Sequence, residues 1–151
     1  MNTGKMISLR SLALAFWELP QDALGLVLLG AARAVGDVVA LERDKGRLFI
    51  ESRSLGVSLG YFVFWSRGRN RYFRADELMR RHEYGHSFQS RWLGPLYLPL
   101  VGVPSVSRVL YGMAYREVTG TRWKNYYAGY PESWADRLGG ITPAERQAAL
   151  Q

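Results

Sequence analysis

Two histidines stand four residues apart in this chain, in the motif HEYGH that runs from His82 to His86. On a helix, side chains four positions apart lie one above the other, so both imidazoles can bind one zinc ion from the same face. Glu83 follows the first histidine, where its carboxylate can reach a water molecule on that ion. The spacing predicts a metal site with Glu83 as general base. The competing interpretation is a core-facing helix in which Glu83 pairs with an arginine.

A zinc ion that performs chemistry is usually held by three protein ligands and keeps its fourth position for water. Both histidines are already used and cysteine is absent, so the third ligand must be a carboxylate. Glu132 is the preferred candidate because it begins a predicted helix and has Asp136 one turn later on the same face. Asp136 can then accept the free N–H of a ligand histidine. The alternatives are Glu117 as the ligand, or Glu132 and Asp136 as surface charges that compensate Arg137.

The composition limits what other chemistry the chain can perform. Its 151 residues suit one domain, and 48% apolar against 22% charged residues are typical of a globular protein. The absence of cysteine excludes disulfides, thiolate metal sites, iron–sulfur clusters and a cysteine nucleophile. The 20 basic residues outnumber the 13 acidic ones, which gives a net charge of +7.

Much of the positive charge lies in an arginine cluster between positions 67 and 81. Such a cluster can bind an anionic partner, which could be a nucleic acid, a lipid headgroup or an acidic peptide. No known nucleic-acid-binding motif accompanies it, so we predict no specific nucleic-acid partner and favour a solvated loop followed by the start of a helix. The members of the cluster are Arg67, Arg69, Arg71, Arg74, Arg80 and Arg81.

Regular helical patterns position the candidate site. The clearest one predicts a helix over 76–93, which carries the histidine motif. Asp76 can cap its first turn, and Gly94-Pro95 ends it. A short helix over 132–138 would present the candidate carboxylates. A last helix opens with the capping box TPAE, which begins at Thr142.

A change of hydrophobic period to two between residues 46 and 66 predicts a β-hairpin beside these helices. Its strands cover 47–51 and 55–65, with a turn at 52–54. The apolar, proline-containing stretch that follows the histidine helix, at 96–106, is expected to be a buried irregular connection. A further helix is predicted over 107–118.

The first segment, 8–33, is expected to form a helix that breaks near Leu19-Pro20. Basic residues before a short apolar run are typical of a signal peptide, but Glu18 interrupts the run, so we favour a cytoplasmic location. No uncharged apolar stretch reaches the roughly 18 residues that a membrane span needs. For the apolar runs at 23–32 and 92–107 we favour burial in the core, with peripheral contact to a membrane surface as the alternative.

The motif HEYGH, followed further along by a glutamate and an aspartate four residues apart, resembles the gluzincin metallopeptidases, the thermolysin-like clan. In that clan the two histidines and the glutamate of a second helix bind zinc, and the aspartate hydrogen-bonds the first histidine. The resemblance therefore assigns the ligands of Zn²⁺ to His82, His86 and Glu132. It assigns the general base to Glu83 and the partner of His82 to Asp136.

Most of the chain is also similar to a small group of predicted bacterial zinc peptidases. The similarity lies in the motif with the residues that follow it up to Leu98, and in the segment Phe16–Gln21. Together these resemblances imply a minimal zincin-like domain that spans residues 1–151. It would be of the α+β class, mainly helical, with a small antiparallel hairpin or sheet beside the motif helix.

The chain departs from the thermolysin-like clan in two respects that bear on catalysis. Pro131 stands where the clan usually has asparagine before the ligand glutamate, and no second lobe or spare histidine is present to stabilise an oxyanion. We assign that role to Tyr127 or Tyr130, with Tyr126 and Arg116 as alternatives. The competing interpretation is that these tyrosines only pack at the rim of the site.

The leading hypothesis for function is zinc-dependent hydrolysis of a peptide bond in a peptide or protein substrate, as in a metalloendopeptidase. The hairpin would supply an edge strand along which an extended substrate pairs. The alternative is a zinc-binding domain without catalysis, a degenerate zincin, which could also associate with a membrane surface.

Overall fold

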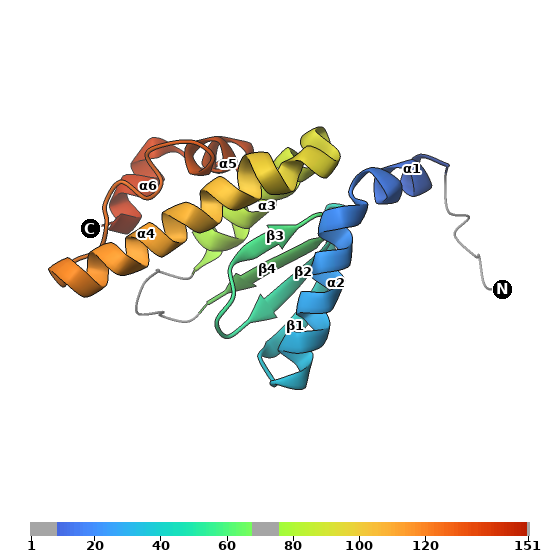
Figure 1. The fold of residues 1–151 in the computed structure, drawn as a ribbon, viewed down its shortest axis with the longest axis horizontal. Helices are drawn as coiled ribbons and strands as arrows, with labels where there is room; N and C mark the ends of the chain where they lie inside the picture. The colour runs from blue at the N-terminus through green and yellow to red at the C-terminus, as the bar shows by residue number, and fades with distance from the viewer. Residues whose placement is uncertain (1–8, 68–75, 151) are drawn as a thin grey trace.

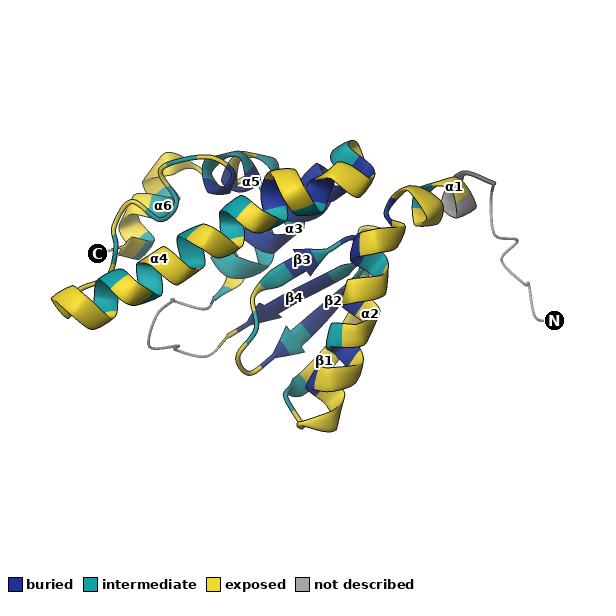
Figure 2. Ribbon diagram, viewed as in Figure 1, coloured by how far each residue is buried: buried dark blue, intermediate teal, exposed yellow. Residues whose placement is uncertain are grey.

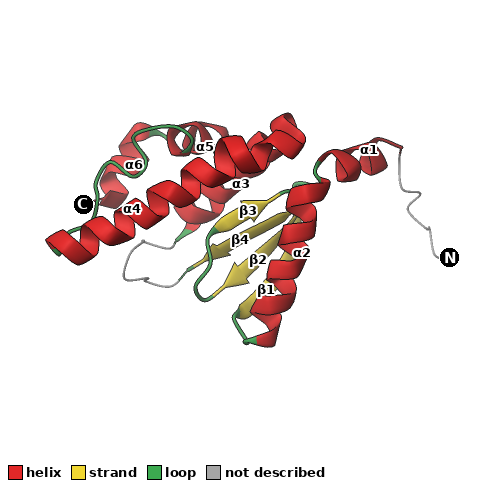
Figure 3. Ribbon diagram, viewed as in Figure 1, coloured by secondary structure: helices red, strands yellow, loops and turns green. Residues whose placement is uncertain are grey.

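The structure, a computed structural model, describes residues 9–67 and 76–150. It has the predicted α+β class, with helices arranged around one small four-stranded sheet (Figures 1 and 3). The helices are α1 Leu9–Trp17, α2 Leu19–Ala34, α3 Glu77–Leu93, α4 Val103–Thr119, α5 Glu132–Leu138 and α6 Pro143–Leu150. The strands are β1 Val38–Asp44, β2 Arg47–Ser52, β3 Val57–Leu59 and β4 Phe62–Ser66. A 3₁₀ turn, η1 Gly94–Leu96, and a π-helical turn, η2 Leu98–Gly102, connect α3 to α4.

The sheet is mixed, which corrects the predicted antiparallel hairpin. Its strand order is β1-β2-β4-β3, and β2 pairs with β4 in parallel. The segment predicted as one strand over 55–65 divides at Gly60, where φ is +61°. The chain turns there because the Tyr61 N–H donates to the carboxylate of Asp22, with 2.6 Å between the nitrogen and the oxygen. β3 therefore folds back on the outer side of β4, and β3 is an edge strand.

The sequence analysis also missed β1, which forms an antiparallel hairpin with β2, as β3 does with β4. The two strands are joined by Lys45-Gly46, with φ of +49° and +73° at these residues. Two-residue turns with positive φ at both positions match the right-handed twist of the strands that they join. The sheet therefore consists of two hairpins, β1–β2 and β3–β4, that pair in parallel through β2 and β4.

Helix α3 occupies the centre of the molecule, between the sheet and α5 (Figure 2). The Asp76 carboxylate accepts the Leu78 N–H at 3.0 Å, as the predicted cap requires, and the helix ends at Gly94. On the sheet side, Met79 and Tyr84 pack against a core cluster of Phe49, Val63 and Trp65.

The apolar stretch at 96–106 is neither irregular nor uniformly buried, so that prediction is wrong. The chain stays helical through η1 and η2 and continues into α4 at Val103, with Pro104 in the first turn of α4. Tyr97 and Val101 are buried, whereas Leu96 and Leu100 are exposed. Within the described residues, no helix has both the length and the apolar character required to traverse a membrane.

The described members of the arginine cluster pair with carboxylates. Arg67 lies near Glu51, Arg80 near Glu42 and Asp44, and Arg81 near Glu145, at distances between 2.8 and 3.3 Å. Arg69, Arg71 and Arg74 lie outside the described residues. The three described arginines therefore join the sheet, α3 and α6 to one another.

Candidate metal centre

His82, His86 and Glu132 converge where α3 contacts α5. The Nε2 atoms of His82 and His86 lie 2.9 and 3.2 Å from Oε2 of Glu132, and 3.2 Å from each other. Atoms that bind a tetrahedral zinc at 2.0–2.1 Å are about 3.3 Å apart. The three atoms thus have close to the mutual spacing of one face of a zinc tetrahedron. All three residues are buried.

The other ring nitrogen of each histidine has its own partner. Nδ1 of His82 lies 2.7 Å from Oδ1 of Asp136, and Nδ1 of His86 lies 2.7 Å from Oε1 of Gln89. The amide of Gln89 is oriented because its Nε2 donates to the carbonyl of Pro131 at 3.1 Å. Both Nδ1 atoms therefore carry a hydrogen, and each ring, once its Nε2 is unprotonated, directs the lone pair of that nitrogen to the centre of the cluster.

Three acceptors that face one another favour a cation between them. A single proton can satisfy one of these contacts, whereas a divalent metal ion satisfies all three. Oε1 of Glu132 is also buried and has no hydrogen-bond partner among the described residues. Two imidazoles and a carboxylate form a donor set that suits zinc and that other divalent transition metals can share. These residues therefore fit a Zn²⁺ ion.

The protein groups around the cluster set its protonation. Burial disfavours the charged form of Glu132, but hydrogen bonds with His82 and His86 outweigh burial and hold the pKa of Glu132 well below its ordinary value. Burial also disfavours the imidazolium of His82, yet the carboxylates of Asp136 and Glu132 raise the pKa of His82 to about 9. Metal binding at neutral pH would thus displace a proton from the cluster.

Arg146 holds Asp136 in position, a role that the sequence analysis missed. Its Nε donates to Oδ2 of Asp136 at 2.8 Å, and its Nη2 donates to Oδ1 at 2.5 Å. Burial alone would raise the pKa of Asp136, but the hydrogen bonds with His82 and Arg146 outweigh burial and lower that pKa below its ordinary value. The carboxylate of Asp136 therefore stays charged. The signal in the sequence was indirect: the capping box at Thr142 starts α6, and Arg146 lies one turn later.

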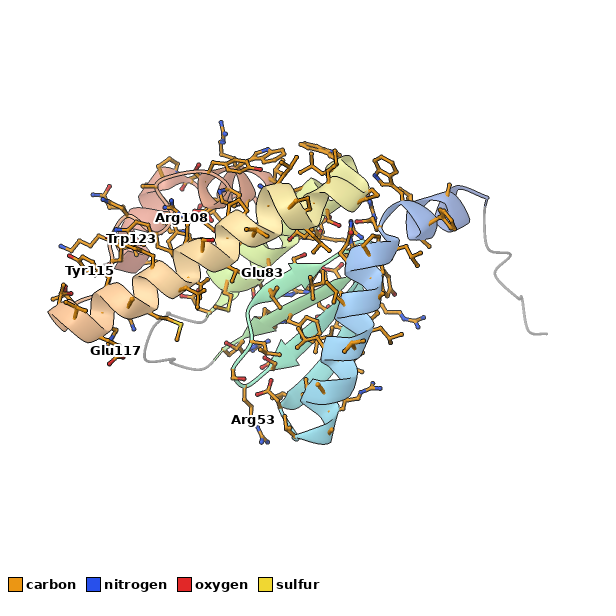
Figure 4. All side chains as sticks on the ribbon, viewed as in Figure 1. Arg53, Glu83, Arg108, Tyr115, Glu117 and Trp123 are labelled. Atoms are coloured by element: carbon orange, nitrogen blue, oxygen red, sulfur yellow. The ribbon has the colours of Figure 1, made fainter. Side chains whose placement is uncertain are left out.

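Glu83 is buried beside the cluster, in the wall of a cavity of about 380 Å³. In Figure 4 its side chain projects from α3 between α4 and the sheet. Burial raises the pKa of Glu83, and the nearby His86 and His82 oppose this effect. The lining includes Leu55, Gly56, Met79, Val109, Met113, Tyr126 and Tyr127 as well as His82. The cavity thus gives a substrate-sized group access to Glu83.

Two of the three candidate tyrosines lie at this cavity. The ring of Tyr127 packs edge-on against His82, with 5.2 Å between ring centroids, and that of Tyr126 packs against Tyr127 at 4.6 Å. Burial raises the pKa of both hydroxyls, so they remain neutral hydrogen-bond donors. The structure does not bring Tyr130 to the site, because its hydroxyl donates to the carbonyl of Leu100 at 2.6 Å.

Two glycines allow α5 to approach α3 closely enough for Glu132 to reach the histidines. Gly85 lies inside the motif, and a Cβ there would collide with the backbone carbonyl of Ala135. A Cβ at Gly139 would collide in the same way with the carbonyl of Arg81. Glu117, the alternative ligand, lies near the end of α4 on the exposed surface and is absent from the cluster.

A buried ion pair connects the start of the chain to the other end of α3. Nη1 and Nη2 of Arg47 lie 3.0 and 3.1 Å from the carboxylate oxygens of Glu18, and Nη2 also donates to the carbonyl of Ser87 at 2.7 Å. Ser90 donates to the same carboxylate at 2.8 Å. Glu18, which interrupts the leader-like apolar run, is therefore a core residue that helps to position the motif helix.

Comparisons with known protein families, with curated proteins and with solved structures find no match to this chain.

Proposed function

We propose that this protein is a zinc-dependent peptidase that resembles the gluzincins and hydrolyses a peptide bond in a peptide or protein substrate. The observation that supports the proposal most is the convergence of two Nε2 lone pairs and the Glu132 carboxylate in one buried cluster. A bound zinc ion supplies a water of lowered pKa and polarises the scissile carbonyl. His82, His86 and Glu132 would hold that ion.

Glu83 would act as the general base. It would take a proton from the attacking water and deliver it to the leaving amine. Its burial supports this role, because a raised pKa brings a carboxylate closer to the pH at which it must both accept and release a proton. Tyr126 and Tyr127 are buried, neutral donors at the same cavity, so either hydroxyl could stabilise the oxyanion.

Strand β3 supports a peptide as the substrate. It is an edge strand, but the carbonyl of its central residue, Ser58, already accepts the Tyr97 hydroxyl at 2.8 Å, so an extended chain would pair with the segment directly before it. Gly56, directly before β3, lies so close to the base that a Cβ there would come within 3.4 Å of Oε1 of Glu83. A peptide paired beside Gly56 would therefore pass the general base.

The second candidate function is metal binding without catalysis. The deep burial of the cluster favours it, because Glu132 is 0% exposed and each histidine is 4% exposed. Such a metal would join α3 to α5 and stabilise the domain. Zinc binding by the purified protein without cleavage of any peptide would favour this second function over the first.

The two candidates are separated by a peptide-library digestion of the purified protein with and without a chelator, alongside metal analysis. Glu83→Gln should retain stoichiometric zinc and lose activity by about 10²–10⁴-fold, the usual worth of a general base. The matched control is Glu77→Gln, an exposed first-turn glutamate of α3, which should behave like wild type. Full activity of zinc-loaded Glu83→Gln would reject the assignment of the base. Equal zinc content in wild type and Glu132→Ala would reject the proposed ligand set.

A further inference from the structure

The outward face of α2 is almost entirely apolar. Leu26 and Val27 are 62% and 69% exposed, and Phe16 and Trp17 continue the exposed apolar surface into α1. Arg33, in the last turn of α2, is the only charged residue among the exposed positions of this helix. An apolar helix face without a covering element usually marks an interaction site.

Helix α4 has a second apolar stripe on its outward face. The exposed residues recur at helical spacing and include Val103, Val106, Leu110 and Tyr111, and Leu110 is 60% exposed. Leu96 and Leu100 extend the stripe towards α3. In Figure 2, α2 lies in front of the sheet and α4 lies in front of α3, and both helices show exposed residues to the viewer. We call these two stripes together the apolar face.

The charges around the apolar face are one-sided. In the sequence, no aspartate or glutamate occurs between Glu83 and Glu117, which covers the end of α3 and nearly all of α4. The two carboxylates near the start of α2 point inwards, since Glu18 pairs with Arg47 and Asp22 accepts the Tyr61 N–H. The whole chain carries a net charge of +7.

We propose that the apolar face docks on the surface of an anionic lipid bilayer. Exposed aliphatic side chains can enter the boundary between headgroups and acyl chains, and the positive chain is attracted to anionic headgroups. Half-exposed tryptophans suit the same boundary, and Trp17 and Trp92 are 47% and 57% exposed. Between Val103 and Tyr111 the stripe of α4 carries no carboxylate that anionic lipids would repel, and the exposed Glu117 lies further along the helix, near its end. This inference does not depend on the proposed metal site.

The docking would place the candidate site at the membrane. Val109 and Met113 of α4 line the cavity that contains Glu83, on the flank of the helix next to the exposed stripe. A bilayer against that stripe would therefore lie beside the mouth of the cavity. Any peptide substrate would then be a segment close to the membrane surface.

The test is co-sedimentation of the full chain with vesicles of phosphatidylcholine alone, or with roughly one third phosphatidylglycerol. Wild type should bind the anionic vesicles at least about tenfold more tightly than the neutral ones, and binding should survive chelation of metal. Val27→Asp/Leu110→Asp should lower the partition coefficient by about tenfold or more. Each change removes an aliphatic group that docking would bury in the bilayer, and each adds an anion. Leu150→Asp, at an exposed position of α6, is the matched control and should bind like wild type.

Circular dichroism and light scattering complete the design. If the double aspartate variant is unfolded, Val27→Ser/Leu110→Ser takes its place and should weaken binding in the same direction. Equal binding of wild type to both kinds of vesicle, or equal binding of a folded double variant, overturns the proposal. The proposal is also overturned if wild type is a dimer that does not bind vesicles while the double variant is a monomer, because a second copy of the chain would then cover the apolar face.

Discussion

Gln89 fixes the tautomer of His86. Its amide N–H₂ donates to the carbonyl of Pro131, so its Oε1 must face Nδ1 of His86, which lies 2.7 Å away. The lone pair of Nε2 is thereby directed to Glu132. One neutral side chain thus links the motif helix to the start of α5 and orients the imidazole of His86 at the same time.

This contact predicts that Gln89→Leu weakens zinc binding without removing a ligand. Loss of a partner that orients a ligand histidine typically lowers metal affinity by about 10–100-fold. Competition against a chromogenic chelator measures the effect. Gln89→Glu keeps an acceptor for Nδ1–H and should lose less affinity than Gln89→Leu. Wild-type affinity in Gln89→Leu would show that the amide does not orient His86.

Gly85→Ala should destabilise the fold, because its methyl group would enter the space held by the carbonyl of Ala135. Overpacking of this kind typically costs about 1–3 kcal/mol, and here the obstacle is backbone. Urea denaturation should show the loss in the free energy of unfolding. Gly30→Ala in α2 is the matched control, since no atom lies within 4 Å of its added Cβ. It should leave stability unchanged or raise it by up to about 1 kcal/mol. Equal effects of the two changes would contradict the close approach of α5 to α3.

Arg47→Met should lower the free energy of unfolding by up to about 3–5 kcal/mol, because it leaves the buried carboxylate of Glu18 with only the more distant guanidinium of Arg91, 3.9 Å away. Adding Glu18→Gln should recover a large part of that loss, since the uncompensated charge disappears. A double-mutant cycle from denaturation curves measures the coupling. Additive effects of the two changes would indicate that the two side chains do not interact.

If the protein is a peptidase, Tyr126→Phe or Tyr127→Phe should lower kcat by about tenfold or more with little change in KM, because an oxyanion donor acts in the transition state. Tyr130→Phe serves as the control, since its hydroxyl is bound to the carbonyl of Leu100. Steady-state kinetics on one cleaved peptide provide the comparison. An unchanged kcat in both Tyr126→Phe and Tyr127→Phe would show that neither hydroxyl stabilises the oxyanion.

The local parts of the site could be predicted from the sequence. The cap at Asp76, the end of α3 at Gly94 and the capping box at Thr142 depend on neighbouring residues alone, and the structure contains all three. The spacing from His82 to His86 likewise fixes a shared helix face. The proximity of Glu132 to that face was expected only from its neighbour and from a resemblance, because contacts between distant helices leave no periodic signal.

The errors arose where distant contacts decide the structure. The division of the segment 55–65 depends on Asp22, which lies 39 positions before Tyr61, and no local pattern records that contact. The stretch 96–106 was expected to be buried because it is apolar, yet Leu96, Leu100 and Val103 are exposed. Composition predicts which residues avoid water, but it does not show which of them the fold can cover.

The Glu18–Arg47 pair has a consequence for any maturation of the chain. Trp17 donates to the carbonyl of Arg91, and Gln21 donates to that of Gly94, so residues 17–21 close the end of the helix that bears the histidines. A processing protease that cut after Glu18 would remove its carboxylate and leave the buried guanidinium of Arg47 without its counter-charge. Removal of residues up to and including Glu18 should therefore destabilise the fold, whereas trimming that stops before Trp17 leaves these contacts in place.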